Sequence, residues 1–372
     1  MWLLMKNTRK IGLITFIISS SLGFAPAYAK ASQDAASIND FSRLSSSYAY
    51  VSPAYPEMSV SQKKKIVTIL SIDGGGMLGI LPANILDQLE QKTKVATSDL
   101  FDLMVGTSTG ALLVTTLAIP NQQGGPLYSA QDSVQFYRKN GPIIFKKTFW
   151  HQCKVLWGLI GSVFSNQNLL LFLNHHYGGL QFSQLRSHVI IPCGLMLNNT
   201  PYWFNTTESK YSPESDFLVK DAVAASISAF GAFEPHFLKN IAGSWFDYGF
   251  DAGLFINNPT LQAYLDAKAI YPNRQYVIVS LGAGIAPQSK TFKEPSIFEH
   301  YGFDAVFPAF TAALNLHSSQ TDYQMRMLAS KGESPDIVAY YRFNITDSSG
   351  NLTMKSMFNA SPENIKKIDS LS

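Results

Sequence analysis

The sequence predicts an α/β fold with a mostly parallel central sheet, because short apolar runs alternate with segments of helical periodicity. The clearest run, residues 65–72, is rich in β-branched residues and stops at Asp73-Gly74. This pattern is typical of a strand that is buried on both faces of a sheet. Residues 276–282 form a second run of the same kind, closed by a glycine. A chain of 372 residues can bury the core of one large domain or of two.

The remaining elements follow from the same two patterns. Apolar, β-branched runs predict strands at residues 100–105, 187–197, 201–206 and 337–345. Apolar residues at helical spacing predict helices at residues 80–93, 111–118, 215–228, 303–329 and 361–368. No internal repeat interrupts this order.

Residues 149–173 are an unusually apolar stretch. A helical insertion that packs on the core is favoured, because apolar helical stripes usually face a core. The alternative is a cap that contacts acyl chains or a bilayer.

The first 29 residues have the pattern of a secretory signal peptide. Basic residues between positions 6 and 10 precede an uncharged apolar run at residues 11–24, and Ala27-Tyr28-Ala29 is an A-x-A cleavage site. The apolar run is short for a membrane-spanning helix, which needs roughly 20 residues. We therefore expect an exported bacterial protein, located in the periplasm or outside the cell. Residues 30–62, rich in Ser, Ala and Tyr, are expected to form a poorly ordered lead-in.

The charge and the cysteines narrow the class of protein further. Residues 1–29 hold three of the 29 basic residues and no acidic one, so the rest of the chain carries 26 charges of each sign. Such a neutral chain gives no reason to expect a nucleic-acid partner. Cys153 and Cys193 are the only cysteines. Export would permit a disulfide between them, and two small buried apolar side chains are an equal alternative.

A candidate nucleophile lies in Gly106-Thr107-Ser108-Thr109-Gly110, a G-x-S-x-G sequence between a predicted strand and a predicted helix. In this context the turn exposes the Ser108 hydroxyl, and the flanking glycines relieve crowding. The following helix directs the positive end of its dipole at the site. The hydroxyl still requires a neighbouring base that accepts its proton.

A glycine-rich loop follows the first buried strand. The consecutive amides of Gly74, Gly75 and Gly76 can bind an anion, which in acyl transfer is the oxyanion of the tetrahedral intermediate. Together with Gly79 this loop also matches the G-x-G-x-x-G fingerprint of dinucleotide-binding proteins. That alternative is disfavoured, because the second strand ends in the serine turn and not in a ribose-binding acid.

Asp251 is the candidate base, with Asp247 as the fallback. An aspartate in a turn is most often a turn former, but its place after the serine and glycine motifs favours a general base within hydrogen-bond reach of Ser108. A Ser-His-Asp triad that uses His236 or His300 is the alternative, although nothing around either histidine singles it out. No histidine pair has metal-ligand spacing with a matching carboxylate, so neither a metal nor a cofactor is expected.

The three motifs, in this order, resemble the patatin-like phospholipase family, which joins D-G-G-G-x-x-G, G-x-S-x-G and D-G-[GA]. Residues 224–233 and Asn257-Asn258-Pro259 are similar to the segments that flank the aspartate in that family. The resemblance spans roughly residues 63–341. It implies a three-layer α/β catalytic domain at residues 63–345, followed by a C-terminal extension at residues 346–372.

The resemblance also implies a function. It is a lipid acyl hydrolase with a Ser108–Asp251 dyad and an oxyanion hole at the glycine loop. Phospholipids, lysophospholipids and related acyl lipids are its substrate class, taken from a membrane or micelle surface by peripheral contact. Two positions depart from the family pattern: the aspartate motif is D-A-G, and Leu78 stands where the family often has Arg or Lys. The first leaves a catalytically inactive, secreted lipid-binding or host-interaction protein as an alternative. The second leaves neutral acyl esters open as substrates, because no cation is placed to meet a phosphate.

Overall fold

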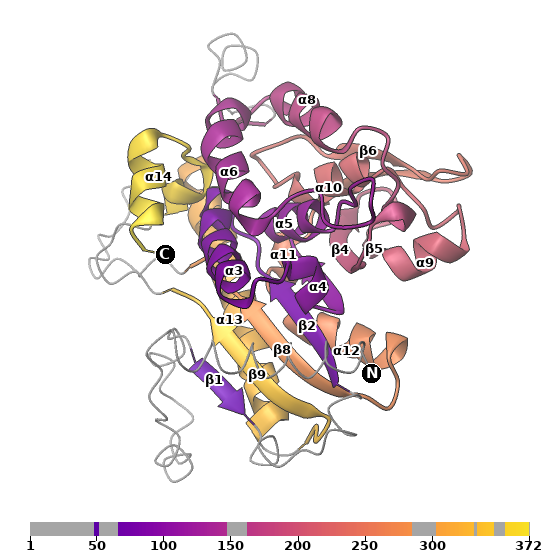
Figure 1. The fold of residues 1–372 in the computed structure, drawn as a ribbon. Coiled ribbons are helices and arrows are strands. Elements are labelled where there is room, and N and C mark those ends of the chain that lie inside the picture. Colours follow the sequence, from indigo (N-terminus) through magenta and orange to yellow (C-terminus); the bar gives the residue numbers. More distant parts are fainter. Residues whose placement is uncertain are drawn as a thin grey trace.

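A nine-stranded sheet with helices on both faces forms the centre of the molecule (Figure 1). It is seen in a computed structural model that describes residues 48–51, 66–146, 162–284, 303–330, 333–345 and 354–371. The strands are β1 (Tyr48–Val51), β2 (Ile66–Ile72), β3 (Leu103–Gly106), β4 (His188–Leu195), β5 (Thr200–Asn205), β6 (His236–Lys239), β7 (Phe246–Asp251), β8 (Gln275–Leu281) and β9 (Ile337–Phe343).

The strands lie in the order β1-β9-β8-β2-β3-β4-β7-β6, and β5 pairs with β4 outside this path. The five strands β9, β8, β2, β3 and β4 run parallel to one another. In contrast, β1, β5, β6 and β7 pair antiparallel with their neighbours. The expected α/β class with a mostly parallel central sheet is therefore confirmed. In such a sheet, ligands bind outside the carboxyl ends of the parallel strands, and the candidate motifs follow β2 and β3.

The helices divide between the two faces of the sheet. They are α3 (Ile80–Thr93), α4 (Thr97–Leu100), α5 (Thr109–Leu117), α6 (Ala130–Ile144), α8 (Asn166–Tyr177), α9 (Thr206–Tyr211), α10 (Val219–Ile227), α11 (Gly253–Ile256), α12 (Thr260–Ile270), α13 (Phe303–Ser330) and α14 (Pro362–Asp369). Three 3₁₀ helices accompany them: η3 (Gly76–Gly79), η5 (Phe182–Gln184) and η7 (Met354–Phe358). Side chains of α12 and α13 pack on one face, and those of α3, α5, α6, α8 and α10 belong to the core of the other face.

Strand β2 shows why its sequence is apolar throughout. Val67 and Ile69 belong to the core beneath α12 and α13, whereas Leu70 and Ile72 belong to the core on the opposite face. All seven residues of the strand are buried. A strand with a helical layer on each face has no solvent side, so the usual alternation of polar and apolar residues disappears.

The boundaries of the other predicted elements agree within two residues, except at β3 and at the helix predicted from residue 215, which begins as α10 at Val219. A strand was expected from Leu100, but residues 97–100 form the single turn α4 and β3 begins at Leu103. Asp102 explains the shift: its carboxylate accepts hydrogen bonds from the amide and the hydroxyl of Thr68, both at 2.9 Å. These bonds fix the start of β3 against β2.

Several sequence expectations fall partly or wholly outside the described residues. The signal peptide at residues 1–29 is one of them, as is Cys153, while Cys193 is buried on β4 with a free thiol. Of the expected lead-in, residues 48–51 form β1 and pair with β9. In the apolar stretch 149–173 the described part contains the start of α8, where Leu169 and Leu173 pack into the core.

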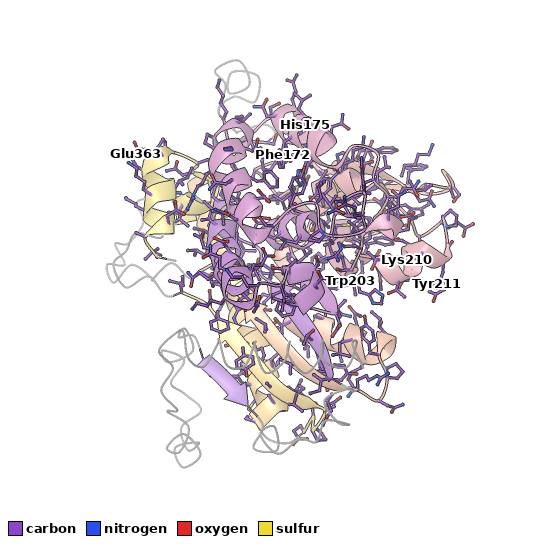
Figure 2. All side chains as sticks on the ribbon, in the orientation of Figure 1. Phe172, His175, Trp203, Lys210, Tyr211 and Glu363 are labelled. Atoms are coloured by element: carbon purple, nitrogen blue, oxygen red, sulfur yellow. The ribbon has the colours of Figure 1, made fainter. Side chains whose placement is uncertain are left out.

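Both polar and apolar side chains are exposed on the surface of the described residues. Figure 2 shows side chains filling the space between the helices and the sheet, with Lys210 and Glu363 at the periphery. Within the described ranges, no helix combines the length and the apolarity that crossing a bilayer requires.

Candidate active site

Ser108 lies on the sharp turn that joins β3 to α5. Its backbone has φ 54° and ψ −119°, a conformation that costs a non-glycine residue on the order of 1–3 kcal/mol. The Thr107 amide donates to the Ile72 carbonyl at 3.1 Å, and the Thr107 hydroxyl donates to the Ile256 carbonyl at 2.7 Å. The neighbouring elements therefore hold the serine in the strained position that the G-x-S-x-G pattern predicts.

The two glycines of this turn are required by space. A Cβ on Gly106 would lie 2.3 Å from the Gly110 carbonyl oxygen, and a Cβ on Gly110 would lie 2.3 Å from the Ile72 carbonyl oxygen. Both distances are far inside van der Waals contact. Glycine is thus required at both positions of the motif because α5 approaches β2 and β3 closely.

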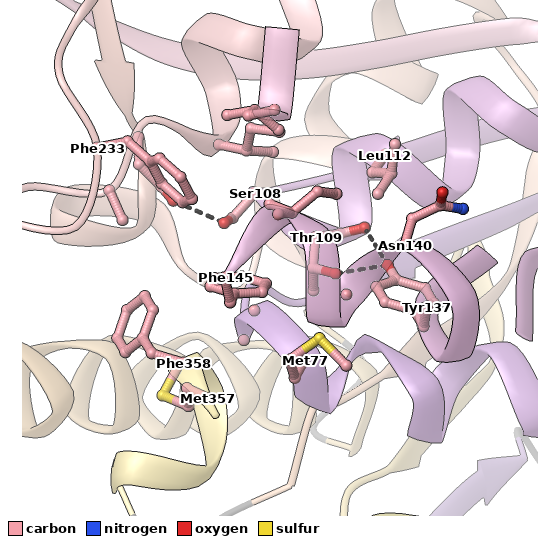
Figure 3. Close-up of a pocket in the computed structure, with 18 of the residues that line it drawn as sticks. Met77, Ser108, Thr109, Leu112, Tyr137, Asn140, Phe145, Phe233, Met357 and Phe358 are labelled. Atoms are coloured by element: carbon pink, nitrogen blue, oxygen red, sulfur yellow. Dashed lines mark hydrogen bonds between the residues drawn. The ribbon is translucent and has the colours of Figure 1, made fainter. Parts of the chain in front are cut away.

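Asp251, the aspartate of the last motif, contacts Ser108 in the folded chain. It is the last residue of β7, where it lies opposite Cys193 on β4. The Ser108 hydroxyl donates to Oδ2 of Asp251 at 2.6 Å (Figure 3, dashed line at Ser108). The Gly253 amide donates to Oδ1 at 2.7 Å. The structure therefore brings together the predicted nucleophile and the predicted base.

The surroundings of Asp251 make its carboxylate a stronger base. The side chain is almost completely buried, and burial raises its pKa to about 6. The hydrogen bonds from Ser108 and Gly253 oppose this shift, because they stabilise the ionised form. The group is therefore ionised at neutral pH, yet it holds a proton more readily than an exposed aspartate.

Asp247, the fallback base, has a different place. It lies at the other end of β7, where its carboxylate accepts from the amides of Leu197 and Asn198 at 2.9 and 3.2 Å and from the Asn198 side chain at 2.8 Å. These bonds close the turn between β4 and β5. Asp247 therefore has a structural role away from Ser108.

The histidines of the triad alternative are also accounted for where they are described. His236 lies 3.0 Å from the Asp221 carboxylate, and His300 lies outside the described residues. Among the described residues that line the pocket around Ser108, none is a histidine. The arrangement is thus a serine–aspartate pair.

The glycine loop differs in one respect from the expected oxyanion hole. The Gly74 amide already donates to the Asn257 carbonyl at 3.1 Å, so it is not free for an oxyanion. The amides of Gly75 and Gly76 donate to no acceptor among the described residues, and both residues line the pocket with Ser108. The role of Gly74 is instead its small size, because a Cβ there would lie 2.5 Å from Asn257 Oδ1 and 3.2 Å from the Ser108 Cβ.

An amide that could serve as a further oxyanion donor was missed in the sequence. The Thr109 amide, at the first position of α5, also has no acceptor among the described residues, and Thr109 lines the same pocket. The residue after the nucleophile contributes such a donor in the G-x-S-x-G turn of other hydrolases. The motif itself was therefore a sufficient signal.

Tyr137 on α6 holds the start of α5 in place. Its hydroxyl donates to the Thr109 carbonyl at 3.1 Å and accepts from the Thr109 hydroxyl at 2.5 Å (Figure 3). Burial raises the pKa of Tyr137 far above its ordinary value, so it remains a neutral hydrogen-bond donor. No sequence motif marks this tyrosine.

A buried ion pair fixes the residue that precedes the glycine loop. The Arg342 guanidinium on β9 donates to both carboxylate oxygens of Asp73, at 2.8 and 2.6 Å, and the Ser318 hydroxyl donates to Asp73 at 2.5 Å. Burial alone would lower the pKa of Arg342, but the adjacent Asp73 carboxylate raises it above its ordinary value. The bidentate pair holds the loop from below.

Ser108 opens into an apolar pocket with a volume of about 800 Å³, its mouth included (Figure 3). Among the described residues, its polar lining consists of backbone at the glycine loop and of Ser108, Thr109, Tyr137, Asn140, Asp251 and Asn257. Most of its lining is apolar: Met77, Leu112, Phe136, Ile144, Phe145, Leu169, Phe172, Ile227, Ala229, Phe233, Leu314, Met357 and Phe358. Such a pocket can hold an apolar group whose reacting carbon lies next to the serine hydroxyl.

The two departures from the family pattern have simple structural explanations. Ala252 has ordinary helical dihedrals and is fully buried, so the backbone after Asp251 does not require glycine. Leu78 is 4% exposed, belongs to the core and is absent from the pocket lining. Position 78 is therefore a core position in this chain, away from the lining of the pocket. Among the described residues, no group of three or more His, Cys, Asp or Glu side chains could hold a metal ion.

The chain is similar in sequence to known proteins of one family. Residues 70–264, more than half of the chain, match the family model "Patatin-like phospholipase". Patatin-like protein 2 of Oryza sativa subsp. indica is 34% identical over 224 residues, which are 57% of this chain and 55% of that protein. Patatin-like protein 4 of Arabidopsis thaliana is 30% identical over 248 residues, 61% of this chain and 62% of that protein. The chain thus spans somewhat more than half the length of these relatives.

A solved structure of human GIVD cytosolic phospholipase A2 covers 85% of this chain and 58% of that chain. The sequences are 11% identical and the TM-score is 0.45.

The position of Leu78 gives a first prediction. We expect Leu78→Arg to lower the free energy of unfolding by about 3–5 kcal/mol, because it places an unpaired charge in the core. Hydrolysis of phospholipid and of neutral glyceride should fall together. Leu265→Arg is the matched control, since Leu265 is 49% exposed and the change should stay within about 0.5 kcal/mol. Thermal unfolding and both assays measure this; a selective gain on phospholipid at unchanged stability would restore the headgroup role.

The ion pair beneath the glycine loop gives a second prediction. Arg342→Met should cost about 3–5 kcal/mol of stability, because it leaves the Asp73 carboxylate buried without its partner. The double variant Asp73→Ala/Arg342→Met should recover part of this loss, since neither charge remains. Urea unfolding of the single and double variants measures both values. A single variant that loses less than about 1 kcal/mol would contradict the tight pairing.

Proposed function

The chain belongs to the patatin-like phospholipase family, and from this premise we propose that it hydrolyses acyl esters of lipids through Ser108 and Asp251. The observation that carries the proposal is the 2.6 Å hydrogen bond from the Ser108 hydroxyl to a buried carboxylate, at the wall of an apolar pocket. A serine with a base in contact and a site for an apolar acyl group meets the requirements of acyl transfer.

The first half-reaction forms an acyl-enzyme. Ser108 Oγ attacks the ester carbonyl carbon, and its proton passes to Asp251 Oδ2. The developing oxyanion accepts hydrogen bonds from the amides of Gly75, Gly76 and Thr109, and loss of one such donor costs about 3 kcal/mol of transition-state stabilisation. The intermediate then releases the alcohol, which takes the proton from Asp251.

The second half-reaction restores the enzyme. A water molecule attacks the acyl carbonyl carbon while Asp251 accepts its proton, and the tetrahedral intermediate again uses the same amides. Collapse releases the carboxylic acid and returns the proton to Ser108. The raised pKa of Asp251 supports this role, because efficient general bases have pKa values near the working pH.

The substrate class follows from the walls of the pocket. Asp251 is the one charged residue among the described residues that line it. No described cation therefore faces a phosphate, and Leu78 is buried below the loop. We infer that the acyl chain contributes most of the binding, so phospholipids, lysophospholipids and neutral acyl esters are all substrates in this proposal.

The site of action is the surface of a membrane or micelle, where such lipids occur, and peripheral contact brings the protein there. The pattern of residues 1–29 supports export to the periplasm or beyond the cell. The catalytically inactive alternative is not favoured, because the D-A-G departure leaves the Ser108–Asp251 contact intact.

The nucleophile gives a third prediction. Ser108→Ala should reduce kcat/KM for acyl esters by at least about 10³-fold, the scale of loss when a catalytic nucleophile is removed. The fold should be unchanged, since one hydroxyl is lost. A fluorophosphonate probe should label the wild-type protein and not the variant. Retained turnover in a well-folded variant excludes Ser108 as the nucleophile, and an unlabelled wild type supports the inactive lipid-binding alternative.

The base gives a fourth prediction, in the pH dependence. Asp251 must be ionised to accept the proton, and burial raises its pKa to about 6. Activity is therefore present above that pH and should fall about tenfold per pH unit below it. Asp251→Asn should lose nearly all activity. His236→Ala and His300→Ala are the controls that should retain it; a histidine substitution as damaging as Ser108→Ala would replace the dyad by a triad.

A further inference from the structure

The pocket is completed by residues far from the three motifs. Met357 and Phe358 belong to η7, beyond the region 70–264 that matches the family model, yet both line the pocket with Ser108. Figure 3 shows them with Phe145 and Phe233 on one side of Ser108, while Leu112, Tyr137 and Asn140 lie on the other. One wall of the pocket therefore comes from residues outside the region that matches the family model.

We propose that the side chains of Met357 and Phe358 form the wall of the pocket that limits the length of the acyl chain. The other residues of the segment 354–371 are the mount that holds this wall in position. This inference rests on the proposed function and adds the residues that select among acyl chains.

Phe358 is part of a cluster of aromatic rings. Its ring centroid lies 6.2 Å from Phe145 and 6.5 Å from Phe164. Phe233 lies 5.8 Å from Phe145 and 5.6 Å from Phe164. Rings at these distances pack against one another. Phe358 is therefore held in a defined position, and a change in its size changes the pocket.

Met357 contacts the glycine loop directly. A Cβ on Gly76 would lie 2.3 Å from the Met357 carbonyl oxygen, so the backbone of η7 packs on the Gly76 Cα. Gly76 has φ 56°, a conformation that glycine adopts without strain. The wall and the oxyanion loop thus share one contact, which fixes their separation.

Helix α14 fixes η7 from the other side. The Asn364 side-chain amide donates to the carbonyls of Ser356 at 3.0 Å and Asn359 at 2.6 Å. The Ser361 hydroxyl caps the helix by accepting a hydrogen bond from the backbone amide of Asn364 at 3.2 Å. The bend between η7 and α14 is therefore closed by its own hydrogen bonds.

The helix is in turn docked on the catalytic core. Arg138 on α6 donates to both carboxylate oxygens of Asp369, at 2.9 and 3.2 Å. Ile365 and Ile368 are buried in the core cluster, while Glu363 is exposed at the periphery (Figure 2). The mount is thus anchored by an ion pair and by apolar contacts, independently of the two wall residues.

Such a wall can discriminate among acyl chains. In an apolar pocket, one methylene more or less changes kcat/KM by about 10–200-fold. A chain that extends to the wall meets Met357 and Phe358, whereas the shortest acyl groups remain near Ser108. Removing the bulk of Phe358 should therefore favour longer chains, and adding bulk should favour shorter ones.

The test compares p-nitrophenyl esters from butyrate to palmitate on the full chain. Phe358→Ala should raise the ratio of kcat/KM for palmitate to that for butyrate by at least about tenfold. Phe358→Trp should lower the same ratio, and Met357→Ala should raise it. Opposite shifts for the smaller and larger residues support the wall. An unchanged chain-length profile in all three folded variants overturns it.

Two further measurements separate the possible causes. Ile365→Val loosens α14 without touching the pocket, so its ratio should stay close to the wild-type value; a shift as large as that of Phe358→Ala assigns the effect to the mount and overturns the role of the side chain. Thermal unfolding identifies any variant that does not fold, and Phe358→Leu then replaces Phe358→Ala. A wild type that hydrolyses no ester and resists fluorophosphonate overturns the proposed function itself, whereas an active wild type with unshifted variants overturns this inference alone.

Discussion

The hydrogen bond between Ser108 and Asp251 depends on where strands end in a mixed sheet. β3 runs parallel to β2 and ends at the serine turn, whereas β7 runs antiparallel to β4 and ends at Asp251. An antiparallel strand runs back toward the amino ends of its neighbours, so the register of β7 is what places Asp251 at the edge where β2 and β3 end. β7 pairs with residues 193–195 of β4, beyond the residues of β4 that pair with β3, and it stops at Asp251. The strained backbone of Ser108 and the tight Gly106–Gly110 contact then set the hydroxyl 2.6 Å from the carboxylate.

The same edge of the sheet must also hold a loop of glycines without side-chain contacts of their own. Fixed groups hold this loop on either side. They are the Asp73–Arg342 pair before it and the Met357 carbonyl, which packs against Gly76. A buried ion pair is weak evidence for stability as such, because desolvation offsets much of the Coulomb attraction. Its value here is geometric, since the bidentate contact fixes the strand end from which the oxyanion donors project.

The sequence revealed those parts of the site that depend on local rules. The serine turn could be predicted because its glycines, the preceding apolar strand and the following helix are contiguous, and the order of the motifs pointed to Asp251. The β7 strand that carries Asp251 was not predicted, because its pattern is inverted. Phe246 and Tyr248 are exposed, whereas Asp247 and Gly249 are buried, so hydrophobic periodicity points to the wrong face. Local patterns fail where buried carboxylates find partners through the fold.

Long-range partners could not be predicted for a related reason. The Gly74 amide looked free in the sequence, but Asn257 occupies it, and Thr109 supplies a donor in its place. Tyr137, Arg342 and Phe358 lie in different helices and strands, and no short motif encodes their approach to the site. Leu78 shows the reverse case: a position whose family pattern suggested a headgroup contact is a core position here.

In the proposed mechanism, burial of Asp251 allows its carboxylate to act as the general base without a histidine. An exposed aspartate holds a proton too weakly to accept one efficiently from a serine near neutral pH. Removing water from the carboxylate destabilises its charge, and its two short hydrogen bonds recover only part of that cost, which leaves its pKa at about 6. In the proposed mechanism, the apolar pocket receives the acyl chain, and Asp251 is buried at the same pocket. Substrate binding and activation of the nucleophile then depend on the same apolar surroundings, which joins the choice of acyl chain to the chemistry at Ser108.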